Sequence, residues 1–437
     1  MKGQFTEIFI LLMFSTLLDY FTGIEIEKSE KVSRRRFWFW LSVSVNLGFL
    51  GVFKYYDFFA LSFAEALSHL GLKVNVFTLQ VILPVGISFY TFYGLSYVID
   101  IYNKKISAER NFINYGLFVS YFPLLVAGPI ERATHLLPQI KISRSFNYSL
   151  AVQGLRQILW GFFKKVVVAD NCAIFADAVF QNYEAASLSQ LIFGILFFSF
   201  QIYGDFSGYS DIALGTSKLF GIKLLRNFAF PYFSRDIAEF WRRWHISLSS
   251  WFRDYLYIPL GGSRGGKWMS VKNTFIIFIV SGFWHGANWT FIAWGFLNAL
   301  YFMPLLLSSR NRVHLNIAGE KSMLPSLKEF IQILSTFILV SLAWVFFRAP
   351  SISDAIHYMQ LIFTNNGYTA IEELSPLYSL ISILILILFE WGGRHSDIPF
   401  IQFKNVIIRR CAYMLVFIMI FLLGAYINPR SFIYFQF

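Results

Sequence analysis

Long apolar runs, separated by short polar or basic segments, make up most of this 437-residue chain. Many of these runs are close to the ~20 residues that a helix needs to cross the hydrocarbon core of a membrane. Apolar spans or stretches are predicted at 7–23, 37–59, 79–102, 112–130, 187–219, 275–307, 327–347, 377–391 and 411–427. The pattern predicts an all-α polytopic membrane helical bundle with roughly nine to eleven membrane-inserted helices.

Two of the runs should be broken by polar residues. Residues 187–219 contain Tyr203–Asp211, whose two carboxylates and two glycines are poorly placed against lipid and should face protein or water. Residues 275–307 are too long for one untilted span, and Gly286–Asn288 is the expected break.

The segment 150–180 is ambiguous because Lys164 and Lys165 interrupt its apolar sequence, so an interfacial or partly re-entrant helix competes with a simple span. The loops 308–326 and 350–375 are polar enough to lie outside the bilayer. The sequence has no internal repeat, low-complexity tract or linker to a soluble domain. We therefore predict a single membrane-embedded domain over the whole chain.

The chain carries 37 Lys and Arg against 25 Asp and Glu, which gives a formal net charge of +12. The excess lies between the apolar runs, so the positive-inside rule explains it without a nucleic-acid partner. Arg34–Arg36 and Arg264–Lys272 should share the cytoplasmic side, with residues 60–78 outside. The two cysteines make neither a disulfide framework nor a metal motif.

The stretch Asp236–Gly262 combines aromatic and basic side chains. If it begins as one helix, i, i+3 and i+4 spacing places several of them on a common face. That face contains Trp241, Trp244, His245, Leu248 and Phe252, and another contains Arg242, Ser249 and Arg253. An aromatic face beside a basic face suits a helix at the membrane boundary, where His245 is either functional or an interfacial anchor.

His285 lies instead in apolar sequence that follows Lys272. The intervening helical residues would carry the chain roughly 20 Å inward, at about 1.5 Å per residue. The hydrocarbon core is only about 30 Å thick, so His285 would lie deep within it. An ionisable group at that depth is expected to face a cavity as part of a functional site, and a histidine satisfied by a backbone carbonyl is the alternative.

Other catalytic signatures are incomplete. Gly261–Lys267 has the spacing of a P-loop, but Trp268 replaces the Ser or Thr that would bind magnesium. No histidine pair has metal-ligand spacing on one helix, so no metal site is predicted. A neutral imidazole at His285 could take a proton from a hydroxyl. With no Ser or Cys nucleophile evident, direct attack of an acceptor hydroxyl on an acyl thioester is the economical mechanism, with no bound cofactor.

Several motifs together resemble the membrane-bound O-acyltransferase family. They are Leu83–Phe89, Ala127–Pro129, Asp205–Asp211, Trp241–Gly262 and Gly282–Asn288. The resemblance is closest to the bacterial branch that contains alginate O-acetyltransferase and the teichoic-acid D-alanyl transfer protein, and it covers most of the chain. It maps the family's near-invariant histidine onto His285 and its second active-site polar position onto His245. Members usually begin with another hydrophobic hairpin ahead of the segment matching Phe9–Phe53, so this start is either truncated or that of a shorter variant.

The resemblance implies a funnel-shaped bundle with a thin floor, the acyl donor below it and the acceptor above it. It also implies acetylation of an exported polysaccharide at the bacterial inner membrane, as in alginate O-acetylation, with help from extracytoplasmic partner proteins. We expect His285 to act as the base, and His245 to orient the donor or to stabilise charge on the thioester carbonyl. The donor or substrate tunnel would be lined by Trp241, Arg242, Arg243, Trp244, Asp205, Asp211, Trp284 and Asn288.

Arg242, Arg243 and Arg253 would attract an anionic donor such as coenzyme A, although membrane anchoring explains them nearly as well. Two other functions stay open. A polysaccharide or lipid transporter could use the same polar interior as a conduit, but the paired broken helices common in transporters are not evident in the sequence. A structural membrane scaffold would leave His285 and Asp205 without a role.

Overall fold

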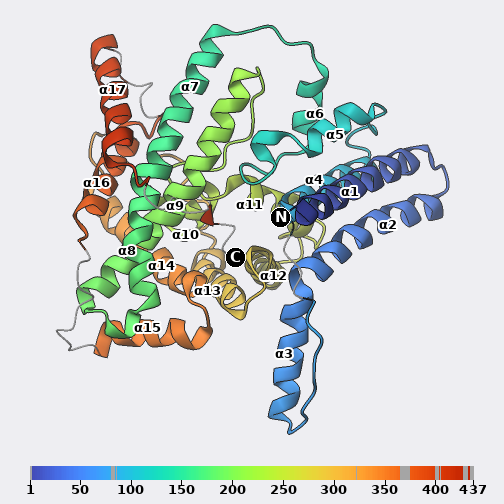
Figure 1. The fold of residues 1–437 in the computed structure, drawn as a ribbon, viewed down its shortest axis with the longest axis horizontal. Helices are drawn as coiled ribbons and strands as arrows, with labels where there is room; N and C mark the ends of the chain where they lie inside the picture. The colour runs from blue at the N-terminus through green and yellow to red at the C-terminus, as the bar shows by residue number, and fades with distance from the viewer. Residues whose placement is uncertain are drawn as a thin grey trace. The chain divides into compact units, whose positions relative to one another are not determined.

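The computed structural model describes residues 2–79, 84, 86–320, 322–364, 375–398, 403, 405–426 and 432–433. Every regular element within these ranges is helical, which confirms the predicted all-α class (Figure 1). The chain divides into two compact units, residues 1–145 with 222–225 and residues 146–221 with 226–437. The single domain expected from the sequence stays a prediction.

The first unit contains the helices of the N-terminal third. They are α1 (Lys2–Lys28), α2 (Val32–Leu50), the π-helical turn η1 (Gly51–Tyr55), α3 (Tyr56–His69), α4 (Ile87–Tyr102), α5 (Phe112–Val119), the 3-10 turn η2 (Phe122–Leu124) and α6 (Ala133–Lys141). The predicted span at 79–102 begins late, because α4 starts only after Gly86, whose φ is 76°. Residues 80–83 and 85 of that prediction lie outside the described residues.

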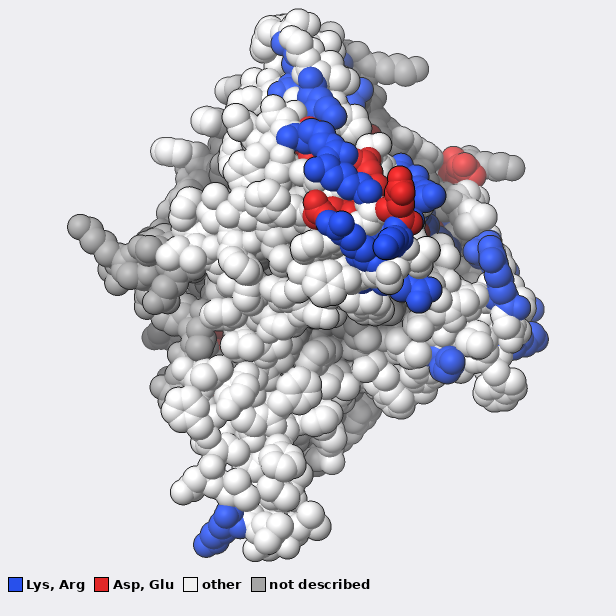
Figure 2. All heavy atoms as spheres, turned by 90° about the vertical axis from the view of Figure 1, so that its right-hand side faces the viewer, with Lys and Arg blue, Asp and Glu red and all other residues white. Residues whose placement is uncertain are grey.

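The two basic loops of the first unit lie at one end of it. Arg34 pairs with Glu25 across the α1–α2 turn at 2.9 Å, and Arg110, which follows α4, pairs with Glu27 at the end of α1. Figure 2 shows Lys and Arg side chains gathered with Asp and Glu side chains in one part of the face it views. Alternating spans return the chain to the same side, and the positive-inside rule predicts that this side is the cytoplasmic one.

The second unit carries the remaining helices. They are α7 (Tyr148–Phe162), the π-helical turn η3 (Phe163–Ala169), α8 (Asp170–Gln181), the 3-10 turn η4 (Tyr183–Ala185), α9 (Leu188–Leu219), the 3-10 turn η5 (Pro231–Phe233), α10 (Ile237–Arg243), α11 (Ile246–Phe252), the π-helical turn η6 (Arg253–Tyr257), α12 (Lys267–His285), α13 (Trp289–Leu307), α14 (Leu327–Arg348), α15 (Ile352–Thr364), α16 (Leu377–Gly392) and α17 (Val406–Leu423). The predicted break in 275–307 is confirmed between α12 and α13. The predicted loop 350–375 contains α15, and its residues 365–374 lie outside the described residues.

The predicted interruption of the run 187–219 is wrong, because α9 is one continuous helix of 32 residues. Its glycines do not break the helix. They lie where the backbone of α7 packs directly against the backbone of α9. A Cβ built on Gly215 would lie 2.5 Å from the carbonyl oxygen of Gly154, and one on Gly208 would lie 2.8 Å from that of Gly161. The glycines of α9 therefore form a packing surface for another helix.

The carboxylates of α9 face the protein, as expected, and they are paired. Lys164 and Lys165 of η3 lie beside them: Lys164 Nζ is 2.5 Å from Asp211 Oδ2, and Lys165 Nζ is 2.8 Å from Asp205 Oδ1. These pairs explain the ambiguous segment 150–180. Its lysines are part of one helical run from α7 to α8, and they are bound to carboxylates of the next helix rather than to water.

Six helical segments within the described residues are long and apolar enough to cross a membrane, by length and composition. They are 9–28, 32–69, 188–219, 289–307, 327–348 and 406–423. The shorter apolar helix α16 matches the span predicted at 377–391, and Ile427 of the last prediction lies outside the described residues. The chain is thus a multi-pass integral membrane protein, while the count of nine to eleven inserted helices stays a prediction.

Candidate active site

His245 lies at a break between two short helices, and the single helix expected across it is not formed. α10 ends at Arg243, α11 begins at Ile246, and His245 has left-handed φ and ψ angles of 43° and 53°. This conformation is uncommon for residues other than glycine, so contacts elsewhere in the structure must hold it. The break turns the imidazole inward, and the side chain is only 1% exposed.

Asn227 holds this break through its backbone and its side chain. Its carbonyl oxygen accepts a hydrogen bond from the backbone N–H of Ile246 at 2.9 Å. Its Oδ1 accepts hydrogen bonds from Ser247 Oγ at 2.8 Å, from the Ser247 backbone N–H at 3.4 Å and from Nδ1 of His245 at 3.1 Å. Its Nδ2 donates to Ser210 Oγ at 3.3 Å. The Ser247 backbone N–H can only donate, so the amide atom next to it, which also faces the imidazole, is the oxygen Oδ1 and not the nitrogen Nδ2.

The contact with Asn227 also fixes the tautomer of His245. An amide oxygen can only accept a hydrogen bond, so Nδ1 carries the proton and Nε2 presents a lone pair. Nε2 is buried and has no hydrogen-bond partner among the described residues. Burial lowers the pKa of His245 from 6.5 to about 3, which keeps the ring neutral at physiological pH. Nε2 is therefore the atom that can accept a hydrogen bond from a substrate.

His285 is the last residue of α12, and the tight α12–α13 hairpin fixes its position. A Cβ built on Gly282 would lie 2.2 Å from the carbonyl oxygen of Phe291, and one on Gly295 would lie 2.3 Å from that of Phe278. Only glycine fits at these two contacts. The small residues on either side of this turn therefore let α13 approach α12 closely and hold His285 in place.

The two imidazoles lie close together, with ring centroids 6.5 Å apart. His285 is 5% exposed, so both rings are withdrawn from the surface. Aromatic side chains border them at centroid distances between 4.6 and 6.2 Å: Phe206, Trp284, Trp294 and Phe347. In such an apolar enclosure, hydrogen bonds and partial charges act more strongly than they do in water.

The three tryptophans predicted for the tunnel belong to the aromatic layer around the histidines. Trp284 contacts both imidazoles, at centroid distances of 5.0 and 6.2 Å. Trp241 packs against Trp294 at 5.7 Å, and Trp244 packs against Trp344 at 5.1 Å. Their role in guiding a donor stays a prediction.

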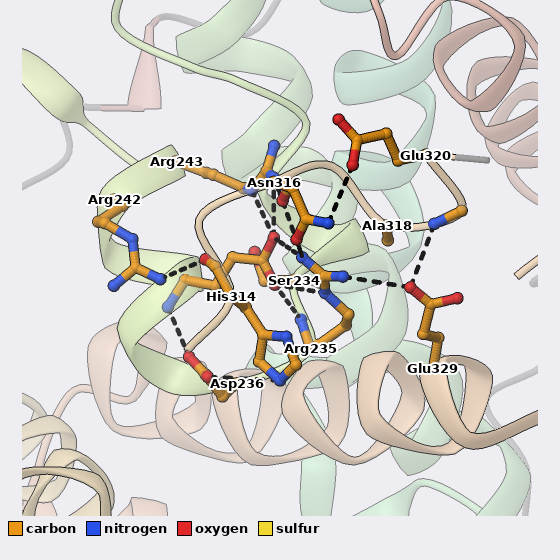
Figure 3. Close-up of polar contacts among 12 residues, drawn as sticks. Ser234, Arg235, Asp236, Arg242, Arg243, His314, Asn316, Ala318, Glu320 and Glu329 are labelled. Atoms are coloured by element: carbon orange, nitrogen blue, oxygen red, sulfur yellow. Dashed lines mark hydrogen bonds and ion pairs between the residues drawn. The ribbon is translucent and has the colours of Figure 1, made fainter. Parts of the chain in front are cut away.

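A buried ion-pair network fixes the start of α10 (Figure 3). Arg235 donates hydrogen bonds to both carboxylate oxygens of Glu239, at 3.0 and 3.2 Å, and to Glu329 of α14 at 3.1 Å. It also donates to the carbonyl oxygen and Oδ1 of Asn316, at 2.8 and 3.0 Å. The network ties α10 to the loop 308–326 and to α14, which supports the break that carries His245.

The arginines expected to attract the donor have partners within the protein. Arg242 donates to two backbone carbonyls of the loop 308–326, both at 2.7 Å, as Figure 3 shows in part. Arg243 pairs with Glu239 at 2.8 Å, and Arg253 pairs with the aspartate that follows it at 2.7 Å. These contacts give each arginine a structural role, and the role in donor binding stays a prediction.

The remaining predicted residues, Asp205, Asp211 and Asn288, have hydrogen-bond or ion-pair partners other than the two imidazoles. Asp205 and Asp211 take part in the ion pairs with η3, and Oδ2 of Asp205 also accepts a hydrogen bond from the Ile433 backbone N–H at 2.7 Å. Asn288 caps α13 by accepting a hydrogen bond from the Thr290 backbone N–H at 3.0 Å. In the described part of the chain, no group of three or more His, Cys, Asp or Glu is placed to hold a metal ion.

Sequence patterns did not single out three aromatic residues that border the imidazoles, Phe206, Trp294 and Phe347, nor the supporting residues Asn227 and Trp344. Trp344 carried a signal, since an indole within the apolar run 327–347 has an N–H that lipid cannot satisfy. Asn227 carried none, because it lies in an irregular segment 18 positions from His245 with no helical spacing between them.

The fold and the site define a multi-pass membrane protein whose two buried histidines share one aromatic enclosure. The membrane-bound O-acyltransferase family matches residues 102–346, which include both histidines. This chain belongs to that family, as its motifs predicted, and its class is that of the O-acyltransferases.

Known proteins resemble the chain over about half to four-fifths of its length. It is 37% identical over 383 residues to the peptidoglycan O-acetyltransferase of Helicobacter pylori, and the matched region covers 82% of this chain and 70% of that protein. It is 39% identical over 359 residues to the probable alginate O-acetylase AlgI of Pseudomonas aeruginosa, covering 81% of this chain and 66% of that protein. A teichoic acid D-alanyltransferase of Streptococcus thermophilus is 32% identical over 232 residues, covering 49% of this chain and 55% of that protein.

Proposed function

We propose that this chain transfers an acetyl group from a thioester donor on the cytoplasmic side to hydroxyl groups of an exported polysaccharide. The observation that carries the proposal is the pair of buried imidazoles, 6.5 Å apart, in one aromatic enclosure. The choice of acetyl group and of acceptor rests on the names of the first two relatives, which specify O-acetylation of peptidoglycan and of alginate. The D-alanyl relative uses a different acyl group, which the experiment below distinguishes.

The reaction joins two substrates without an enzyme-bound intermediate. The acceptor hydroxyl oxygen bonds to the thioester carbonyl carbon, the carbon–sulfur bond breaks, and the hydroxyl proton ends on the released thiol. In this scheme His285 takes the proton as the hydroxyl attacks, which makes it the general base. The enclosure excludes competing water, so the thioester is not hydrolysed.

The tautomer of His245 narrows its role. Stabilising charge on the thioester carbonyl would need a hydrogen-bond donor, but the proton of this ring is directed to Asn227. Nε2 can only accept in this state. His245 therefore orients the donor, by accepting a hydrogen bond from an N–H group such as those of a pantetheine arm.

The two substrates would arrive from opposite sides of the bacterial inner membrane. The donor side is the side of the basic loops, which the positive-inside rule assigns to the cytoplasm. The acceptor glycan lies outside, and extracytoplasmic acyltransferase partners assist its modification. A passage through the second unit, lined by both imidazoles, would connect the substrates, with His245 nearer the cytoplasmic mouth.

The test compares surface glycans from cells that lack the protein with glycans from cells that carry the wild-type chain or His285→Ala. Mass analysis should show acetyl groups only with the wild-type chain, at an unchanged amount of glycan. Membrane vesicles supplied with isotope-labelled acetyl thioester should transfer the label in the same pattern. A loss of total exported glycan, with an unchanged acetyl fraction in what remains, would support a transporter instead. Labelling from D-alanyl but not acetyl thioester would correct the acyl group.

A further inference from the structure

A groove of about 380 Å³ lies between α7 and α17 in the second unit. Each helix contributes one face to it, at the same i, i+3, i+4, i+7 spacing. The α7 face consists of Val152, Leu155, Arg156 and Leu159, and the α17 face consists of Val406, Arg409, Arg410 and Tyr413. The groove thus combines apolar walls with three arginines, and none of these residues has a part in the proposed acyl transfer.

The three arginines concentrate positive charge in the groove. Its described lining contains no acidic residue, whereas the buried Arg235 and Arg243 of the same unit are paired with Glu239. The guanidinium carbon of Arg156 lies 5.2 Å from the centroid of the Tyr413 ring, so a charge from α7 reaches across to α17. An anion is the ligand that this charge distribution suits.

The groove lies at the end of the second unit where α9 ends, in sequence that carries the basic residues Lys218, Lys223 and Arg226. Gly154 of α7 packs against the last turn of α9. A Cβ built on Gly154 would lie 3.1 Å from Cβ of Lys218, and α9 ends at Leu219. The Ala425 backbone N–H donates to the carbonyl oxygen of Val166 at 3.0 Å, so α17 runs in the same direction as α7 and its N-terminal arginines lie at that same end. This is the end that the positive-inside rule assigns to the cytoplasm, where anionic lipids provide a negative surface.

We propose that this groove binds one anionic phospholipid, with its phosphate among Arg156, Arg409 and Arg410 and an acyl chain along the apolar wall of α7. Arginine recognises phosphate oxygens through two parallel N–H donors, which makes it well suited to a lipid headgroup. The apolar wall favours a lipid over a soluble phosphate, because the exposed side chain of Leu155 lines a groove whose other wall is α17, a helix long and apolar enough to cross a membrane. Basic pockets between membrane helices on the cytoplasmic side are a known type of headgroup site.

The site is tested on the purified full-length chain in a neutral detergent, by thermal unfolding and by native mass spectrometry. Phosphatidylglycerol should raise the unfolding midpoint by several degrees more than phosphatidylcholine, and one phosphatidylglycerol should stay bound. The combined variant Arg156→Gln, Arg409→Gln, Arg410→Gln should bind phosphatidylglycerol at least about tenfold more weakly, since one charge-assisted contact alone is worth about that factor. The matched control is Arg226→Gln, which removes an arginine paired with the exposed Asp397 and should keep the preference.

A second variant tests whether the lipid binds in the groove or only to the positive charge of the three arginines. Leu155→Trp fills the groove and keeps all three arginines, so it should also lose the bound lipid. Equal binding of phosphatidylglycerol by the wild type and by either variant would overturn the proposal. An equal stabilisation by soluble glycerol phosphate would show a free-phosphate site and would also overturn it. If the triple variant does not fold, Arg410→Gln serves in its place, because this arginine is exposed.

Discussion

The imidazole rings of His245 and His285 lie with their centroids 6.5 Å apart, although His245 lies between α10 and α11 and His285 ends α12. Two separate features bring them together. His245 has a left-handed backbone conformation between α10 and α11, which turns its side chain inward, and Asn227 holds the ring there. Glycine contacts between α12 and α13 hold His285 at the end of its helix. The geometry of the pair therefore depends on residues that carry no reactive group.

Replacing His285 by Ala should abolish acyl transfer, with a loss of about 10²–10⁴-fold in rate, because the general base is removed. The measurement is acetyl transfer by membrane vesicles, normalised to the amount of inserted protein. His395→Ala is the matched control, since this histidine is exposed and should leave the rate unchanged. Retention of most activity in His285→Ala would exclude its assignment as the base.

Replacing Asn227 by Asp should change the pH dependence of the rate. A carboxylate beside Nδ1 favours the protonated imidazole, so the pKa of His245 should rise from its present value of about 3. Once protonated, the ring loses the Nε2 lone pair, and activity should fall as the pH decreases through the raised pKa. The acid limb of the pH–rate profile should therefore move to higher pH by at least about one unit. An unchanged profile, with Ser247→Ala as the comparison, would show that Asn227 does not act through His245.

The buried neutral His245 should also make the protein sensitive to acid. Its pKa is lowered to about 3 in the folded protein, against 6.5 for the exposed group. Between these values the unfolded chain binds a proton that the folded chain does not. This contribution to stability is complete above pH 6.5 and is lost as the pH falls toward 3, with a slope of up to about 1.4 kcal/mol per pH unit. Unfolding midpoints of the wild type and His245→Gln, compared at pH 7 and pH 5, should show a smaller decrease for the variant.

Replacing Gly282 by Ala should destabilise the protein by about 1–3 kcal/mol and displace His285, because the added carbon meets the α13 backbone. Its Cβ would lie 2.2 Å from the carbonyl oxygen of Phe291. Gly48→Ala is the control, since no atom lies within 4 Å of a Cβ at this position of α2, and it should change stability by less than about 1 kcal/mol. Thermal unfolding and transfer rates of the two variants, measured side by side, test the role of the hairpin. Equal stability of both variants would contradict the close contact.

Arg34–Arg36 and Arg264–Lys272 should lie on the cytoplasmic side, with residues 60–78 outside, because of the asymmetry of basic residues between the apolar runs. Single cysteines introduced at positions 72 and 264, in a background without Cys172 and Cys411, should react differently with an impermeant reagent applied to sealed cells. Position 72 should be labelled and position 264 should be protected. Strong labelling at 264 in sealed cells would reverse the proposed sides for donor and acceptor.

The sequence by itself determined the helical class, the positions of most apolar helices and the break at Gly286–Asn288. These features depend on hydropathy over a span and on the local chemistry of glycine and asparagine, so neighbours in sequence suffice to predict them. The motifs also point to His245 and His285, whose catalytic roles stay predictions. The donor and acceptor sides follow from charge placement and stay predictions.

The tertiary structure decided the features in which local sequence and distant contacts disagree. α9 is continuous because its glycines meet Gly154 and Gly161, and its carboxylates meet two lysines, on another helical run. The helix expected across His245 breaks because Asn227 supplies hydrogen bonds that a regular helix would not use. Both outcomes depend on partners far away in the chain, so a pattern read along one segment could not reveal them.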